Sequence, residues 1–251
     1  MNTTPIQPAN ITPNVATLVT AFIVDINQRT NIDQYIENGR KLLNIKVPKV
    51  IFMDASLMYR FTDIDTEYNK LVPTTKDDIY TFKLKSEITN FSIITTNQSK
   101  DTIDYMLLIC NKTEWMRQAI EINHFNTKQF IWIDFGIYYI YGGQEFLFQR
   151  SVELMCQRTY DKVRIASIVD YGPNENIYHS VHWFFAGGVF GGDINSLIKF
   201  ANLMKERTQH IIRTRHTLMW EVNIWALIYM ENKDLFHRYK CDHDATITFN
   251  Y

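Results

Sequence analysis

Short apolar runs that alternate with a helix-like segment constrain the fold of this chain more than any other feature. The segments Ala16–Val24, Lys49–Asp54 and Phe130–Asp134 are largely apolar and β-branched, as is typical of strands covered on both faces. Between the first two, Ile32–Leu43 repeats apolar residues at steps of three and four, which predicts a helix with one buried face. A repeated strand–helix–strand order favours an α/β fold with a mostly parallel sheet.

The remaining segments extend this order along the chain. Their apolar patterns predict strands at Phe91–Thr96 and Val163–Val169, and helices at Ile103–Ile122, Ile194–Leu203 and Met219–Met230. The polar segment Thr62–Lys76 comes nearest to a domain boundary, but apolar periodicity resumes directly after it. We therefore expect residues 15–251 to form one domain after a loose, polar tail at residues 1–14.

The charge balance and the cysteines exclude several classes of protein. The chain has 26 Lys and Arg against 27 Asp and Glu, so it offers no general field for nucleic acid. Its three cysteines form no C-x-x-C pair, which favours reduced thiols over a disulfide framework or a zinc site. The N-terminal residues lack the regions of a signal peptide, and no apolar run approaches the roughly 18 residues of a membrane span. We expect a cytoplasmic protein without a membrane span.

Asp134 is the first candidate for a functional residue. It ends the most apolar short strand and is followed by Phe135 and Gly136, which we expect to open space. In an open α/β sheet, ligands bind outside the carboxyl ends of the strands. The carboxylate of Asp134 can therefore hold a ribose hydroxyl or a divalent cation. The alternative is that it only caps the following turn.

A glycine-rich block, Ala186–Gly192, is the second candidate. It holds four of the nine glycines of the chain, and its spacing matches neither a P-loop nor a dinucleotide fingerprint. Its glycines either let backbone N–H groups approach a ligand or form a tight turn or bulge near the core.

Three further groups of polar residues stand out. Glu221 lies in an otherwise apolar helical segment, so it is expected to be either paired or functional. The triplet Asp-His-Asp at residues 242–244 groups potential metal ligands, or it forms a solvated polar turn. His179 and His182 lie three residues apart, and positions in a loop or in the core explain them better than a metal site.

Taken together, these blocks resemble the HtrL/YibB–WlaTC group of glycosyltransferase-like proteins, which are associated with bacterial surface-polysaccharide loci. The resemblance runs from about Thr17 to Tyr251. The order of the Trp-Ile-Asp-x-Gly and Gly-Gly-x-x-Gly-Gly blocks is its most specific part. The blocks that carry it are Leu18–Ile26 with Arg29 and Tyr35, Pro48–Asp54, Asn126–Ile137, Ala186–Gly192 and the closing Asp-His-Asp with Asn250-Tyr251.

The wider resemblance is to glycosyltransferases of the GT-A type. It implies a GT-A-like, Rossmann-related α/β fold with a mostly parallel central sheet flanked by helices. It also implies transfer of a hexose from a UDP-sugar to a hydroxyl of a glycan, a lipid-linked saccharide or a glycoprotein, with Mn²⁺ or Mg²⁺ as the metal.

The resemblance further implies a role for individual residues. Asp134 would be a carboxylate of the Asp-x-Asp motif, and Glu221 would be the acid that faces the acceptor or the transferred sugar. Lys112 would reach the diphosphate as a point charge. The donor would be contacted by Thr20, Ala21, Phe22 and Arg29 at the nucleotide and by Gly187 and Gly188 at the sugar.

The chain departs from the GT-A pattern two residues after Asp134, where Gly136 replaces the second acid. A metal would then be held by Asp134 with His243, or there would be no metal. The missing acid favours a rival function, a catalytically inactive carbohydrate- or protein-binding module on the same fold. A nucleotidyltransferase is a third alternative.

Overall fold

The computed structural model describes residues 15–24, 31–95, 97–170, 172 and 175–251. Within these residues, one seven-stranded sheet has the order β3-β2-β1-β4-β6-β5-β7. β6 is antiparallel to both of its neighbours, and the other adjacent pairs are parallel. The prediction of an α/β fold with a mostly parallel sheet is therefore confirmed. The strands are β1 (Ala16–Phe22), β2 (Lys49–Asp54), β3 (Asn69–Thr74), β4 (Gln129–Ile133), β5 (Val163–Ser167), β6 (Phe185–Asp193) and β7 (Phe236–Lys240).

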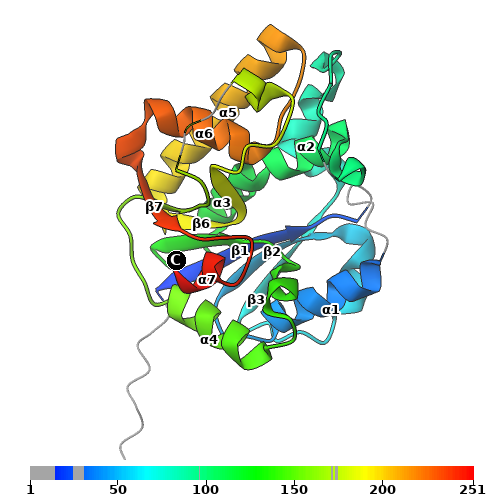
Figure 1. The fold of residues 1–251 in the computed structure, drawn as a ribbon. Helices are drawn as coiled ribbons and strands as arrows, with labels where there is room; N and C mark the ends of the chain where they lie inside the picture. The colour runs from blue at the N-terminus through cyan, green and yellow to red at the C-terminus, as the bar shows by residue number, and fades with distance from the viewer. Residues whose placement is uncertain (1–14, 25–30, 96, 171, 173–174) are drawn as a thin grey trace, which may run out of the picture.

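Helices cover both faces of the sheet (Figure 1). α2, α3, α5 and α6 lie on one face, and α1, α4 and α7 lie on the other. No helix in the described part of the chain is long and apolar enough to cross a membrane. The helices are α1 (Ile32–Leu43), α2 (Ile103–Cys110), α3 (Lys112–Ile122), α4 (Glu145–Met155), α5 (Ile194–Arg215), α6 (Glu221–Glu231) and α7 (Thr246–Phe249).

The central strand β1 shows why these layers form. Leu18 and Val19 are both fully buried, and they belong to hydrophobic clusters on opposite faces of the sheet. Consecutive strand residues point to opposite faces, so a continuous apolar run needs cover on both. Each such buried side chain contributes roughly 1.5–3 kcal/mol relative to an exposed one.

Most of the predicted elements are present with small shifts at their ends. The helix Ile32–Leu43 and the strand Lys49–Asp54 have the predicted bounds. The predicted helix Ile194–Leu203 continues to Arg215, because apolar residues such as Ile211 and Ile212 keep the helical spacing. The expected tail at residues 1–14 lies outside the described residues, and the single-domain organisation stays a prediction.

Two predictions about strands are wrong. Residues 91–95 form no strand, and Ile94 is 77% exposed, because these residues cross the surface without a neighbouring strand. The third strand instead lies within the polar segment Thr62–Lys76, as the edge strand β3. An edge strand can be polar and can carry a proline such as Pro73, because one of its sides faces solvent.

Two further elements differ from the sequence interpretation. The predicted helix Ile103–Ile122 is two helices, which meet at the buried Asn111. The glycine-rich block is not a tight turn, since it forms most of β6. A Cβ atom on Gly191 would lie 2.2 Å from the Tyr251 hydroxyl, so glycine is needed there for Tyr251 to pack against the strand.

Candidate functional site

Asp134 lies at the topological switch point of the sheet, where the chain stops adding strands on one side of β1 and begins to add them on the other. From β1 the chain builds outward through β2 and β3 on one side, and β4 begins the other side. β1 and β4 are parallel neighbours, so their carboxyl ends share one edge of the sheet. Ligands bind at such a switch point in open α/β sheets. Asp134, the residue directly after β4, stands at that edge, whereas Asp25 after β1 lies outside the described residues.

The antiparallel strand β6 brings the glycine-rich block to the same edge. Ile133 at the end of β4 pairs with Val189 in the middle of β6, directly after Gly187 and Gly188. The Asp134 N–H donates to the Gly188 carbonyl at 3.0 Å. Gly187 and Gly188 therefore lie beside Asp134, although more than fifty residues separate them along the chain.

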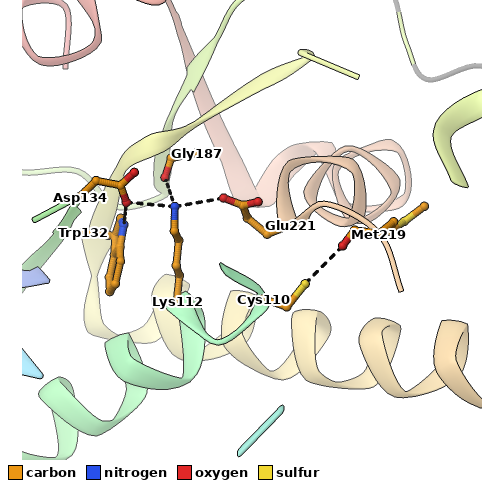
Figure 2. A network of polar contacts seen from close by, with 7 residues as sticks. All are labelled: Cys110, Lys112, Trp132, Asp134, Gly187, Met219 and Glu221. Carbon is orange, nitrogen blue, oxygen red and sulfur yellow. Dashed lines mark hydrogen bonds and ion pairs between the residues drawn. The ribbon is translucent and has the colours of Figure 1, made fainter. Parts of the chain in front are cut away.

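Lys112 joins Asp134 to Glu221 (Figure 2). Its Nζ lies 3.0 Å from Asp134 Oδ1 and 3.0 Å from Glu221 Oε1, and it donates to the Gly187 carbonyl at 2.9 Å. The side chains of Lys112 and Glu221 are only 8% and 4% exposed, whereas that of Asp134 is 39% exposed. We call Lys112, Asp134 and Glu221 the charged triad.

The position of Lys112 is locally unfavourable and is stabilised by its partners. It is the first residue of α3, where the helix dipole disfavours a positive charge. Burial by itself lowers the pKa of the ammonium group, but the charges of Asp134 and Glu221 outweigh burial and raise this pKa above its usual value. Lys112 is thus a permanent cation, and its charge is matched by two carboxylates.

Asp134 is held on one oxygen and faces the cleft with the other. Its Oδ1 accepts from the Trp132 indole N–H at 2.9 Å and contacts Lys112. The following turn is closed by the Asp134 backbone carbonyl, which accepts from Ile137 N–H at 3.0 Å. The carboxylate therefore does not cap this turn in the described structure, and the turn-cap alternative is wrong.

Glu221 is the first residue of α6, and it is both buried and paired. We expected an acid in this apolar segment to be either paired or functional. Glu221 is paired, and its partner is Lys112. The second carboxylate oxygen, Oε2, is buried and has no hydrogen-bond partner among the described residues. A buried acceptor without a partner costs about 1–3 kcal/mol, so this oxygen is suited to a ligand that donates a hydrogen bond.

The charged triad lines an open cleft of about 610 Å³. Pockets that bind small molecules and cofactors have volumes of about 300–1,000 Å³. α1 contributes three polar side chains to the wall, namely Gln34, Tyr35 and Asn38. A smaller cavity of about 50 Å³ adjoins the triad and is lined in part by Ala21.

The two glycines predicted to border a sugar have a clear packing role. A Cβ atom on Gly187 would lie 2.4 Å from Glu221 Oε1, so the glycine makes room for the charged triad. A Cβ atom on Gly188 would lie 3.0 Å from the Ile247 side chain and 3.9 Å from Asp134 Oδ2. Both glycines line the cleft as well. Gly136 also lines the cleft, and a side chain there would clash with the Tyr35 ring.

The residues of β1 that were predicted to contact the nucleotide do not line the cleft. Thr20 and Phe22 are buried, and the Phe22 ring stacks on Phe135 with ring centroids 5.0 Å apart. Ala21 reaches only the smaller cavity. Arg29 lies outside the described residues. Of the seven residues expected to contact the donor, Lys112, Gly187 and Gly188 line the cleft.

The histidines and the C-terminal acids form no complete metal cage. His243 lines the cleft with Asp242 and Asp244, but Asp244 Oδ1 accepts from the Thr246 N–H as in a polar turn. Thr246 thereby holds the pKa of Asp244 below its usual value. His179 is exposed, in agreement with a loop position. Across the described ranges, no group of three or more His, Cys, Asp and Glu is placed to hold a metal ion.

Three aromatic residues in the cleft were not predicted from the sequence. Tyr105, Trp183 and Trp220 come from α2, from the segment before β6 and from the segment before α6. The Asp-x-Asp comparison directed attention to carboxylates, and the aromatic rings are too common in this chain to stand out. The Trp132–Asp134 contact had a detectable signal, because strand residues two apart share a face.

Comparison with known proteins does not assign the chain to a family. No protein-family model and no curated protein sequence matches it significantly. Among solved structures, it is similar to a glycosyltransferase involved in glycosylation of the major capsid of PBCV-1, with a TM-score of 0.42, 11% identity and coverage of 90% of this chain and 81% of that one. It is also similar to a 4-diphosphocytidyl-2C-methyl-D-erythritol synthase from Anaerococcus prevotii, with a TM-score of 0.42 and 8% identity. That match covers 94% of this chain and 91% of the synthase. A third similar structure is Rv0371c of Mycobacterium tuberculosis in complex with manganese, with a TM-score of 0.41 and 7% identity. That match covers 92% of this chain and 90% of Rv0371c. Likenesses at this level do not identify a function.

Proposed function

We propose that this protein is a nucleotide-sugar-dependent glycosyltransferase that moves a hexose from a UDP-sugar to a sugar hydroxyl. The observation that carries the proposal is the charged triad at the floor of the cleft, at the switch point of the sheet. This edge of an open α/β sheet is where nucleotides bind. The triad presents carboxylate oxygens there, which accept hydrogen bonds from ribose and sugar hydroxyls.

The charge of the cleft favours a donor that arrives with a cation. The charged residues that line it are two basic, Lys100 and Lys112, and four acidic, Asp134, Glu221, Asp242 and Asp244. Lys112 is already matched by two carboxylates, so it cannot by itself offset the charge of a diphosphate. The donor set fits Mg²⁺ or Mn²⁺, which bind through one or two protein groups when substrate phosphates supply the other ligands.

Asp134 and His243 are the residues that would hold such a cation. Asp134 can do so through Oδ2, because Trp132 and Lys112 already bind Oδ1. His243 lines the same cleft. When bound, the cation would stabilise the charge that develops on the leaving diphosphate.

The protein's own residues then have separate roles in transfer. Lys112 fixes the orientation of both carboxylates and prevents them from repelling each other. Glu221 Oε2 can accept a proton or a hydrogen bond from a sugar hydroxyl. If the transfer inverts the anomeric centre, Oε2 is the general base that takes the acceptor proton. If the transfer retains the configuration, Glu221 orients the sugar.

The rival function is a binding module without turnover. It is favoured by one observation, the replacement of the second acid by Gly136, whose space is filled by the Tyr35 ring. Both functions predict ligand binding, so turnover is the property that separates them.

A thermal-shift screen tests the proposal. The purified protein is heated with a panel of UDP- and other nucleotide sugars, with and without Mn²⁺. A ligand at 100 times its Kd adds about 2.7 kcal/mol, which for a chain of this size raises the Tm by roughly 5–10 °C. The proposal predicts that one UDP-sugar stabilises the protein selectively and that the shift depends on Mn²⁺. The variant Asp134→Asn should lose the shift, and Asp234→Asn at an exposed site in the segment before β7 should retain it. An absence of stabilisation across the panel would contradict the proposal.

A further inference from the structure

One wall of the cleft is built of aromatic rings. The Tyr105 and Trp220 ring centroids lie 5.6 Å apart, and those of Trp220 and Trp183 lie 5.7 Å apart, both with edge-to-face geometry. All three residues line the cleft. Tyr105 and Trp220 are more than nine-tenths buried, whereas Trp183 is only partly buried. Trp183 is therefore the most accessible of the three rings and serves as the platform. Trp220 packs against it, Tyr105 packs against Trp220, and the His243 ring contacts Trp183 edge-to-face with centroids 4.7 Å apart. We call these three residues the aromatic wall.

Trp183 is held in place by a buried asparagine on α6. Asn223 is fully buried, and its Nδ2 donates to the Ile177 carbonyl at 2.6 Å and to the Ser180 carbonyl at 2.8 Å. Its Oδ1 accepts from the His182 N–H at 2.7 Å, one residue before Trp183. The Trp183 carbonyl accepts from Val169 N–H at 3.3 Å. The platform is thus fixed before any ligand arrives, which reduces the entropy that binding must overcome.

The polar groups next to the aromatic wall are suited to hydroxyls. Trp220 Nε1 is a buried donor without a partner among the described residues, and Oε2 of the adjacent Glu221 is a buried acceptor without one. Sugar hydroxyls can satisfy both kinds of atom, because each hydroxyl both donates and accepts hydrogen bonds. Asp242 and Asp244 add further acceptors to the cleft.

These features together select one class of ligand. An anion that brings no cation is disfavoured, because four carboxylates and only two lysines line the cleft. A lipid chain would leave the unpartnered donor and acceptor unsatisfied. A pyranose ring has an apolar C–H face that packs on an indole ring, and its hydroxyls donate and accept at its edge.

We propose that the aromatic wall binds a pyranose residue of a neutral saccharide acceptor, with the sugar ring packed on Trp183. This inference rests on the proposed transferase function and narrows its acceptor to a neutral saccharide whose pyranose ring packs on Trp183. It also assigns Trp183 as the principal recognition residue for the acceptor. Glu221, next in the chain to Trp220, lines the same cleft and receives a hydroxyl of the bound sugar at Oε2.

Calorimetric titration of the whole protein tests this inference. The probes are methyl glycosides and disaccharides of common neutral hexoses at about 10 mM, with and without UDP and Mn²⁺, a range that detects a millimolar Kd. The wild-type protein should bind at least one of these saccharides. Trp183→Ala should weaken binding about tenfold or more, and Trp183→Phe, which keeps an aromatic face, should recover part of the loss. Tyr59→Ala removes an exposed ring that does not line the cleft and should leave binding unchanged.

Two results overturn the inference. One is that no neutral saccharide binds the wild-type protein under either condition. The other is that Trp183→Ala, with unchanged Tm, binds saccharides as well as the wild type. Failure of the proposed function gives a different pattern, in which saccharides bind through Trp183 but no nucleotide sugar stabilises the protein.

Discussion

Lys112 Nζ and Glu221 Oε1 form a buried ion pair of 3.0 Å between the first residue of α3 and the first residue of α6. Each residue is buried at a helix start, where Lys112 is the ion-pair partner of Glu221 and Lys112 itself is also held by Asp134 and the Gly187 carbonyl. The pair links two helices that pack on the same face of the sheet and fixes the floor of the cleft. It therefore connects the stability of the fold with the geometry of the candidate site.

Replacement of Lys112 should destabilise the protein more than replacement of Glu221. In Lys112→Met, Glu221 becomes a buried charge without a partner, which costs about 3–5 kcal/mol. In Glu221→Gln, Lys112 keeps Asp134 and the Gly187 carbonyl, so a loss of about 1–2 kcal/mol is expected. Urea unfolding of both variants and of the double variant measures the coupling between the two sites. Additive losses in this cycle would show that the two residues do not interact.

Gly187→Ala should disturb the charged triad directly. The new Cβ would lie 2.4 Å from Glu221 Oε1, so Glu221 must move away from Lys112. Overpacking of this kind costs about 1–3 kcal/mol. The shorter side chain of Glu221→Asp removes the atom that clashes, so the double variant should be less destabilised than the sum of the two single variants. Thermal unfolding measures this. A Gly187→Ala protein with wild-type stability and wild-type donor binding would exclude the packing role.

Lys49 should make the stability of the protein rise with pH. It is fully buried at the other end of the sheet, where it donates to the carbonyls of Ile45 and Val47, and burial lowers its pKa to about 7. Between this value and the usual pKa of about 10.4, the unfolded chain binds the proton and the folded protein does not. Stability therefore increases across this window, by at most about 1.4 kcal/mol per pH unit, and is unaffected by Lys49 below it.

Urea unfolding from pH 6 to pH 10 checks this pH dependence. The slope should be smaller in Lys49→Met, which cannot titrate. The exposed-site control Lys233→Met should keep the wild-type slope. Equal slopes in Lys49→Met and the wild type would mean that Lys49 remains charged in the folded protein.

Asn223→Ala should separate acceptor binding from donor binding. The variant loses three hydrogen bonds that hold the segment before Trp183, so a loss of about 2–4 kcal/mol in stability is expected. At a temperature where the variant is folded, saccharide binding should weaken, and stabilisation by the nucleotide sugar should persist. Calorimetry and thermal shift on the same sample measure the two effects. Equal weakening of both ligands would indicate a general loss of structure instead.

The parts of the fold that sequence patterns predicted are those with strong local signals. β1, β2 and β4 are buried on both faces, so their apolar runs are unambiguous. β6 lacked such a signal, because four of its nine residues are glycines. Gly187 and Gly191 pack against Glu221 and Tyr251, which are far away in the chain. β3 was missed because an edge strand needs little apolar surface.

The residues of the candidate site also differ in whether a local sequence signal could predict their role. Asp134 was predictable, since it ends a buried strand and its place at the sheet edge follows from the topology of α/β folds. Lys112 and Glu221 were each identifiable as unusual polar residues, but their pairing depends on how α3 and α6 pack. The break at Asn111, which makes Lys112 the first residue of a helix, had no recognisable pattern. Trp183 was missed because its exposure is set by neighbours from other segments.

The most direct test of the central claim is UDP release from the preferred UDP-sugar, measured with a saccharide acceptor and titrated Mn²⁺. The account predicts acceptor-dependent release by the wild-type protein and by Asp234→Asn. It predicts a loss of about 100-fold or more in Asp134→Asn, because a neutral amide is a weak ligand for a hard cation. A ribose-only role for Asp134 would give a smaller loss, equivalent to roughly 1.5–3 kcal/mol. Unchanged turnover in Asp134→Asn at equal folded content, or no turnover by the wild-type protein with any nucleotide sugar, would contradict the transferase function.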